Sequence, residues 1–127
     1  MRIVEPFVGL FFRLRGHTTV ELTTVGAKSG NEHTVQLLGF PDEADAWLVV
    51  ASYAGAAKHP AWYFNMARNP DKIWLQVGGR KRHVAAENLQ SDEYDAVWQR
   101  LLTRYAGYAS YQEKTDRKIP IVRLTPA

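Results

Sequence analysis

Short apolar runs separated by turn residues predict six β-strands in this chain. β-branched side chains, alternation of apolar and polar positions, and flanking Gly, Pro or Asp are typical of strands. These features mark residues 18–25, 34–40, 47–52, 72–77, 81–87 and 120–124. Glycine-containing turns at 26–31 and 78–79 join two pairs of these strands, so both pairs are expected to form hairpins.

Helical spacing is confined to shorter stretches. A proline suited to a first turn and an Asn-Pro stop predict a helix over residues 60–69. Apolar positions that recur every three or four residues predict a second helix over 91–105, with Ser91 as its N-cap. Two further helical pieces are expected at 7–14 and 108–114.

This order of elements predicts an α+β fold in which a mostly antiparallel sheet closes into a small barrel with peripheral helices. Parallel βαβ winding would need a helix between successive strands, and the first three strands have none. With 127 residues, the chain matches the usual size of one domain. We therefore expect one barrel domain over 1–127, in which 1–16 form an N-terminal amphipathic segment.

Composition excludes several classes of function. The chain has no cysteine, so disulfides, thiolate catalysis and iron–sulfur clusters are excluded, and any redox chemistry needs a bound cofactor. A net charge of +3, spread along the chain, argues against a nucleic-acid partner. The four histidines lack metal-site spacing, so no metal is proposed. No serine lies in a nucleophile-elbow context, which disfavours a hydrolase.

The apolar run at residues 7–14 is too short to span a membrane and lacks the flanks of a signal peptide. A cytoplasmic protein is therefore expected. One interpretation packs this helix on its own domain. The alternative is peripheral contact with the inner face of the membrane through Phe11, Phe12, Arg13 and Arg15.

Residues 26–30, with the sequence GAKSG, have the composition of an anion cradle. Glycines allow backbone N–H groups to turn inward, Ser29 adds a hydroxyl, and Lys28 adds a positive charge. The spacing is not that of a Walker A loop, since no helix follows. A solvated hairpin turn is the alternative.

Two other groups of side chains are candidates for chemistry. Ser52 ends an apolar strand, and Lys58 and His59 precede a helix start whose free N–H groups favour anionic ligands; a surface lysine and a capping histidine are the alternative. Three tyrosines recur every third residue and can share one wall of a substrate pocket, at positions Tyr105, Tyr108 and Tyr111. Their alternative is an aromatic stripe packed on the barrel.

Four motifs occur in an order that resembles one family. They are LTTVGAKSG at 22–30, VVAS at 49–52, KHPAWYFNMARNP at 58–70 and RYAGYASYQEKTDRKIPIVRL at 104–124. In this order the chain resembles the deazaflavin-dependent nitroreductase family, the quinone and nitro reductases of actinobacteria that use coenzyme F-420. The resemblance implies a split β-barrel related to flavin-mononucleotide-binding oxidases.

The resemblance also implies the site residues. The GAKSG turn would hold the phosphate-bearing tail of the coenzyme, and the end of the third strand would lie beside the deazaflavin ring. The implied cofactor-binding residues are Gly26, Lys28, Ser29, Gly30, His33, Gln36, Ala51, Ser52, Lys58, His59, Trp62 and Asn65. The implied catalytic residues are Ser52, Tyr105, Tyr108 and Tyr111. Trp62 and Tyr63 fit the core equally well.

Three positions depart from the family pattern. Ala27 and His33 stand where the family usually has Arg, and Gln36 stands where it has Pro. Each lost charge-assisted bond to an anion removes about 1.5–3 kcal/mol of binding energy. Affinity for the tail is therefore expected to be weaker, or to be made up by Lys58 or by the arginines at 80 and 82.

The implied activity is hydride transfer from reduced coenzyme F-420, an 8-hydroxy-5-deazaflavin, to a small-molecule acceptor: a quinone, an enone or a nitro compound. Two alternatives stay open: a non-catalytic deazaflavin-binding protein, and a flavin-mononucleotide-dependent reductase on the same fold. A homodimer is a further expectation, with Phe11, Phe12 and Trp74 as an exposed patch.

Overall fold

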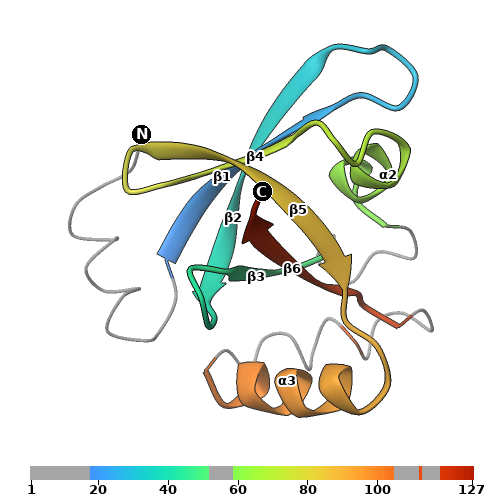
Figure 1. Ribbon diagram of the computed structural model, residues 1–127. Helices are drawn as coiled ribbons and strands as arrows, with labels where there is room; N and C mark the ends of the chain where they lie inside the picture. Colours follow the sequence, from blue (N-terminus) through green and yellow to red (C-terminus); the bar gives the residue numbers. More distant parts are fainter. Residues whose placement is uncertain (1–17, 52–58, 105–111, 113–117) are drawn as a thin grey trace.

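The computed structural model describes residues 18–51, 59–104, 112 and 118–127. Six strands form a closed barrel in the order β1-β2-β3-β6-β5-β4, and every neighbouring pair is antiparallel (Figure 1). The strands are β1 (Thr18–Val25), β2 (Glu32–Pro41), β3 (Trp47–Val50), β4 (Ile73–Val77), β5 (Arg80–Asn88) and β6 (Ile121–Pro126). The helices are α2 (Ala61–Arg68) and α3 (Ser91–Arg104). The predicted antiparallel barrel with peripheral helices is confirmed.

Alternation along the strands produces two apolar cores. Inward-facing residues such as Leu22, Val49 and Leu124 fill the barrel and pack against Trp62 and Met66 of α2. Helix α2 therefore lies against one end of the barrel, beside the β1–β2 hairpin (Figure 1).

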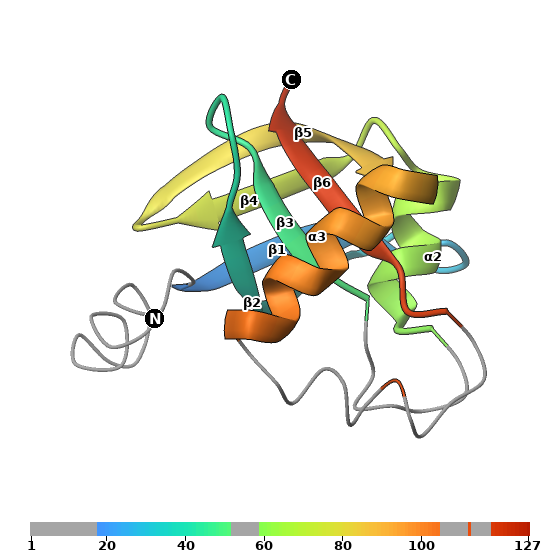
Figure 2. The ribbon, with the colours of Figure 1, turned by 90° about the horizontal axis from the view of Figure 1, so that it is seen from below.

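The second core lies outside the barrel, under α3. Phe40, Leu48 and Ile121 on the outer face of the sheet pack against Val97 and Leu101 of the helix. In Figure 2 this helix crosses β3 and β6. The apolar stripe that the sequence predicted for 91–105 is thus the surface that attaches the helix to the barrel.

An arginine on β6 joins this helix to three other parts of the fold. The Arg123 guanidinium lies 2.8 Å from a carboxylate oxygen of Asp42, 2.8 Å from one of Glu93 and 3.3 Å from one of Glu87. Burial raises the pKa of Asp42, but hydrogen bonds from Arg123 and from the backbone of Glu43 outweigh it, so this pKa is lowered overall. The cluster stabilises the contact between the turn after β2, β5, β6 and α3.

Tyr94 anchors the start of the same helix. Its hydroxyl donates a hydrogen bond to the carbonyl of Ile119, and its ring stacks on Trp98 at 6.1 Å. Burial, with a smaller contribution from the charge of Asp95, raises the pKa of Tyr94 to about 12. The phenol is therefore neutral in the folded protein at ordinary pH.

Element ends differ from the prediction by at most two residues. β2 begins two residues earlier, β3 ends at Val50, and β6 extends to Pro126. Ser91 is the first residue of α3 and not its N-cap, because the carbonyl of Gln90 accepts the first helical bond, from the N–H of Tyr94 at 3.2 Å. The helical pieces predicted at 7–14 and 108–114 lie outside the described residues, except for position 112.

Candidate functional site

Residues 26–30 between β1 and β2, called the GAKSG loop below, are held by their own hydrogen bonds. The Gly26 N–H donates to the carbonyl of Asn31 at 2.8 Å, and the Gly30 N–H donates back to the Gly26 carbonyl at 3.1 Å. Gly30 has a φ of +74°, a conformation that favours glycine. The Ser29 hydroxyl accepts a hydrogen bond from the Asn31 N–H at 3.1 Å. These bonds close the loop into a defined turn.

Helix α2 and its C-cap hold the loop and the end of β1 through two asparagines. The buried Asn65 accepts a hydrogen bond from the Ala27 N–H at 3.0 Å and donates one to the Thr24 hydroxyl at 3.1 Å. One turn later, Asn69 donates to the carbonyl of Val25 at 3.2 Å. The loop is therefore positioned by the helix, and both polar ends of the Asn65 amide are used for it.

Close packing explains the first glycine of the motif. A Cβ at Gly26 would collide with the Ser29 hydroxyl and lie 3.0 Å from Nε2 of His33. A side chain at this position would displace the Ser29 hydroxyl or the His33 ring, so glycine here keeps both side chains in place.

The GAKSG loop has hydrogen-bond donors that are available to an anion. The backbone N–H groups of Lys28 and Ser29 have no acceptor among the described residues, and Lys28 forms no ion pair within that part of the chain. Both side chains are exposed. Consecutive free N–H groups next to an ammonium are a donor set that suits a phosphate.

The two β2 residues implied by the resemblance face different ways. Nε2 of His33 lies 3.4 Å from the Ser29 hydroxyl, so His33 is at the loop. Gln36 lies three positions further along β2, exposed and on the opposite face of the strand, because neighbouring strand positions alternate. The structure brings His33 to the GAKSG loop and does not bring Gln36 there.

Residues from the second and third motifs meet at the same end of the barrel. Ala51 is fully buried, its N–H donates to the Pro120 carbonyl at 2.9 Å, and it shares a core cluster with Trp62. Trp62 is thus a core residue, one of the two interpretations given for it. His59 is half-buried, and its ring lies 4.7 Å from that of Tyr63 and 5.7 Å from that of Phe64.

Five predicted site residues lie outside the described residues. They are Ser52, Lys58, Tyr105, Tyr108 and Tyr111. Ser52 directly follows Ala51 in the chain. Their roles stay predictions.

The arginines at 80 and 82 are not near the GAKSG loop, contrary to the suggestion that they compensate for its lost charges. At one end of β4, Ile73 pairs with Thr24, two residues before the loop; at the other end, Val77 pairs with Arg80. These two ends of β4 are four residues apart along the strand, a distance of roughly 13 Å. Figure 1 shows the β4–β5 hairpin and the β1–β2 hairpin tip pointing in different directions. Of the proposed replacements, only Lys58 stays a prediction.

Trp74 does not form the exposed patch expected for a dimer contact. It is half-buried, with its ring 5.7 Å from that of His83. Among the described residues, the exposed large apolar side chain is Phe64 on α2, which is 50% exposed. The other two members of the expected patch, Phe11 and Phe12, lie outside them.

Sequence reasoning missed three residues that shape this end of the barrel: Thr24, Asn69 and Phe64. Thr24 is a polar residue at an inward position of β1, 1% exposed, and its inward position follows from the alternation of that strand. Asn69 was considered only as a helix stop. Phe64 lies two residues from the core residues Trp62 and Met66, which places it on the outer side of the helix.

Within the described ranges, no group of three or more metal-ligating side chains occurs. Neither helix of that part of the chain is long and apolar enough to cross a membrane.

A sequence profile, curated relatives and solved structures all show similarity of this chain to F420-dependent reductases. A sequence profile described as F420H(2)-dependent quinone reductase matches residues 3–126. The chain is 37% identical over 107 residues to an F420H(2)-dependent quinone reductase of Mycobacterium tuberculosis, covering 82% of this chain and 70% of the relative. Among solved structures, it resembles an F420-H2 dependent reductase at 38% identity and a TM-score of 0.72, covering 84% of this chain and 92% of the other. A chain described as a domain-swapped dimer has the same identity and TM-score, covering 84% and 78%.

Proposed function

The chain belongs to the F420H(2)-dependent quinone reductase family, and on that premise we propose that it reduces quinones with coenzyme F-420 as the hydride donor. Coenzyme F-420 is the cofactor of this family. The relatives in the comparison are named for quinone reduction. Nitro compounds and enones are included in the proposal as further acceptors.

The GAKSG loop is the observation that carries the proposal. It offers two backbone N–H groups that have no acceptor among the described residues, the Ser29 hydroxyl and the exposed Lys28 ammonium, in a turn that Asn65 holds in place. This donor set fits the phosphate of the coenzyme tail. A loop held by the fold binds an anion with less loss of conformational entropy than a loop that must be ordered first.

Other residues at this end of the barrel would orient the ring. We place it beside the end of β3, after Ala51, with His59 and Phe64 of the neighbouring segment as aromatic contacts. When bound, the deazaflavin ring supplies the hydride. The protein then contributes mainly binding and orientation, which is the usual division of work in cofactor enzymes.

The proposal assigns the remaining chemistry to residues from the family resemblance. Ser52 would donate a hydrogen bond to the acceptor oxygen as negative charge develops on it. Tyr105, Tyr108 and Tyr111 would line the acceptor pocket, and one of these phenols would donate the proton that completes the reduction. Singly and jointly substituted Tyr108→Phe and Tyr111→Phe variants test this, because unchanged turnover with every acceptor would contradict it.

The test is anaerobic oxidation of reduced coenzyme F-420 by menadione. Protein-dependent return of the visible absorbance of the oxidised coenzyme is expected, and a nitroaromatic compound and an enone follow as acceptors. Coenzyme binding without turnover of any acceptor would instead favour the non-catalytic binding protein. No coenzyme binding, together with flavin mononucleotide retained on purification, would favour the flavin enzyme.

We also propose a homodimer, supported by the similar solved chain described as a domain-swapped dimer. Sedimentation velocity of the full chain would show twice the monomer mass of 14.4 kDa. A single monomeric species at micromolar concentration would contradict this.

A further inference from the structure

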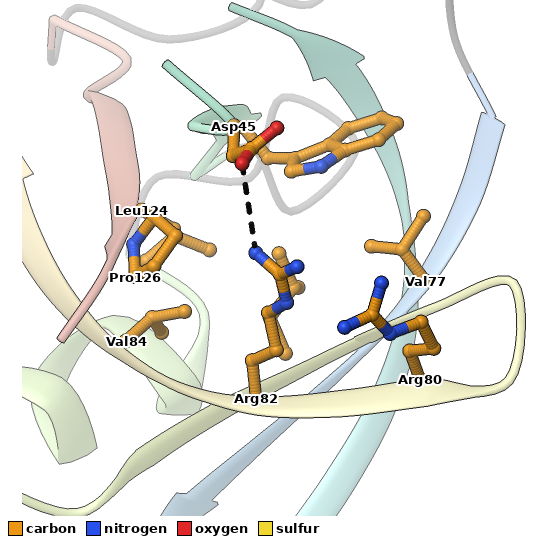
Figure 3. Close-up of a pocket in the computed structure, with 9 residues that line it drawn as sticks. Asp45, Val77, Arg80, Arg82, Val84, Leu124 and Pro126 are labelled. Atoms are coloured by element: carbon orange, nitrogen blue, oxygen red, sulfur yellow. Dashed lines mark ion pairs between the residues drawn. The ribbon is translucent and has the colours of Figure 1, made fainter.

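A hollow of about 160 Å³ opens into the barrel beside the β4–β5 hairpin, away from the GAKSG loop. Its wall includes Leu75 and Val77 of β4, Val84 of β5 and Leu124 of β6. Figure 3 shows these strands around the hollow, with two arginines of β5 entering it. The proposed quinone reductase activity does not use this hollow.

Both arginines occupy inward-facing positions of β5. Arg80, Arg82 and Val84 alternate along the strand, and Val84 is 3% exposed in the barrel core. The two guanidinium groups therefore share the mouth of the barrel, where Figure 3 shows both side chains directed from the same strand into the hollow. Two like charges that line one hollow repel each other, and a bound anion would relieve that repulsion.

The described residues compensate these charges poorly. Arg82 forms an ion pair with Asp45 at 4.0 Å, and the Asp45 side chain is 80% exposed, so the pair is weak. Arg80 has no ion-pair or hydrogen-bond partner among those residues. Positive charge thus remains at the rim of a hollow whose inner wall is apolar, which strengthens the electrostatic field there.

Size and wall chemistry define the ligand class. The volume is close to that of the engineered cavity of about 150 Å³ that binds benzene in another protein. Arginine recognises carboxylates through two parallel hydrogen bonds. We propose that the mouth of the barrel binds a small aromatic carboxylate, with the ring on the apolar wall and the carboxylate on Arg80 and Arg82.

The direct test compares benzoate with its neutral isostere benzamide. Titration of the full-length protein with each compound, followed by chemical shifts in ¹H–¹⁵N NMR spectra, is expected to show saturable binding of benzoate with shifts centred on β4, β5 and the turn before β3. Benzamide should bind at least about tenfold more weakly, because it cannot accept two charge-assisted hydrogen bonds. This comparison needs no variant and so does not depend on a variant folding.

A matched pair of variants locates the site. Arg80→Met keeps the apolar stem and removes the charge, and Lys81→Met removes the same charge from the neighbouring position, which faces away from the hollow. Benzoate affinity should fall about tenfold or more in Arg80→Met and stay within about twofold in Lys81→Met. Affinity for coenzyme F-420 should be unchanged in both, which separates this site from the proposed coenzyme site.

Three results would overturn the inference: no saturable benzoate binding, equal binding of benzoate and benzamide, or equal losses in the two variants. Failure of the quinone reductase proposal would leave these readouts unaffected, since none of them uses coenzyme turnover.

Discussion

Replacing Asn65 with alanine tests whether α2 sets the shape of the GAKSG loop. The substitution removes the acceptor of the Ala27 N–H and the donor to the Thr24 hydroxyl in one step. It leaves the helix intact, because alanine is the best helix former. Both stability and coenzyme binding should therefore change, for the same structural reason.

The expected size follows from the burial of the two partners. Thr24 is 1% exposed, so its hydroxyl loses a partner that water cannot replace, at a cost of about 1–3 kcal/mol. Ala27 is exposed, and water can satisfy its N–H, so this second loss adds less. A total near 2 kcal/mol would lower the urea midpoint of unfolding by about 1 M for a slope of about 2 kcal/mol per M.

The assay pairs urea unfolding, followed by tryptophan fluorescence, with titration of coenzyme F-420. Asn69→Ala is the matched control, because Asn69 is the C-cap residue of α2, one turn after Asn65, and donates its hydrogen bond to the Val25 carbonyl, before the loop begins. Asn65→Ala should bind the coenzyme about tenfold more weakly than Asn69→Ala, a difference of about 1.4 kcal/mol. The reasoning is refuted if Asn65→Ala keeps wild-type affinity, or if both variants lose affinity equally.

Three further predictions concern single contacts. Arg123→Ala should lower the free energy of unfolding by about 1–3 kcal/mol at pH 7. The folded pKa of Asp42 is lowered, so the stability that its ion pair with Arg123 contributes is lost as pH falls below ~4, and the urea midpoints of variant and wild type should converge at acid pH. Tyr94→Phe should reduce the loss of stability between pH 10 and about 12, because the raised folded pKa of Tyr94 stabilises the fold fully below pH 10 and that contribution is lost as the pH rises through about 12; an unchanged pH profile would contradict this. Gly26→Ala should weaken coenzyme binding about tenfold by displacing the Ser29 hydroxyl, as a fluorescence titration would show, and wild-type affinity would mean that the loop adapts.

The barrel could be predicted from sequence because its strands carry local signals. Two hairpins are marked by glycine turns, and alternation in β1 assigns Leu22 to the core face. The errors occur at element ends, where tertiary contacts decide. Ser91 has the side chain of an N-cap, but the carbonyl of Gln90 accepts the first helical bond.

The site was predictable only in part, because sequence motifs do not show which residues bind each other. The GAKSG motif and Asn65 were both identified as coenzyme-binding, yet the amide of Asn65 is bonded to the loop itself. The contribution suggested for Arg80 failed for a similar reason: strand pairing places it opposite Val77, at the other end of β4 from the loop. Charge counting alone could not reveal that separation.

The most direct test of the account measures the affinity of coenzyme F-420 and of its deazaflavin core lacking the phosphate-bearing tail. Both titrations use wild type, Lys28→Ala and Lys81→Ala, the last as a control with the same charge change on β5. If the GAKSG loop holds the tail, Lys28→Ala should weaken the full coenzyme by about tenfold or more and the tail-less compound by less than about twofold. Equal losses for both compounds in Lys28→Ala, or no loss at all, would contradict the account.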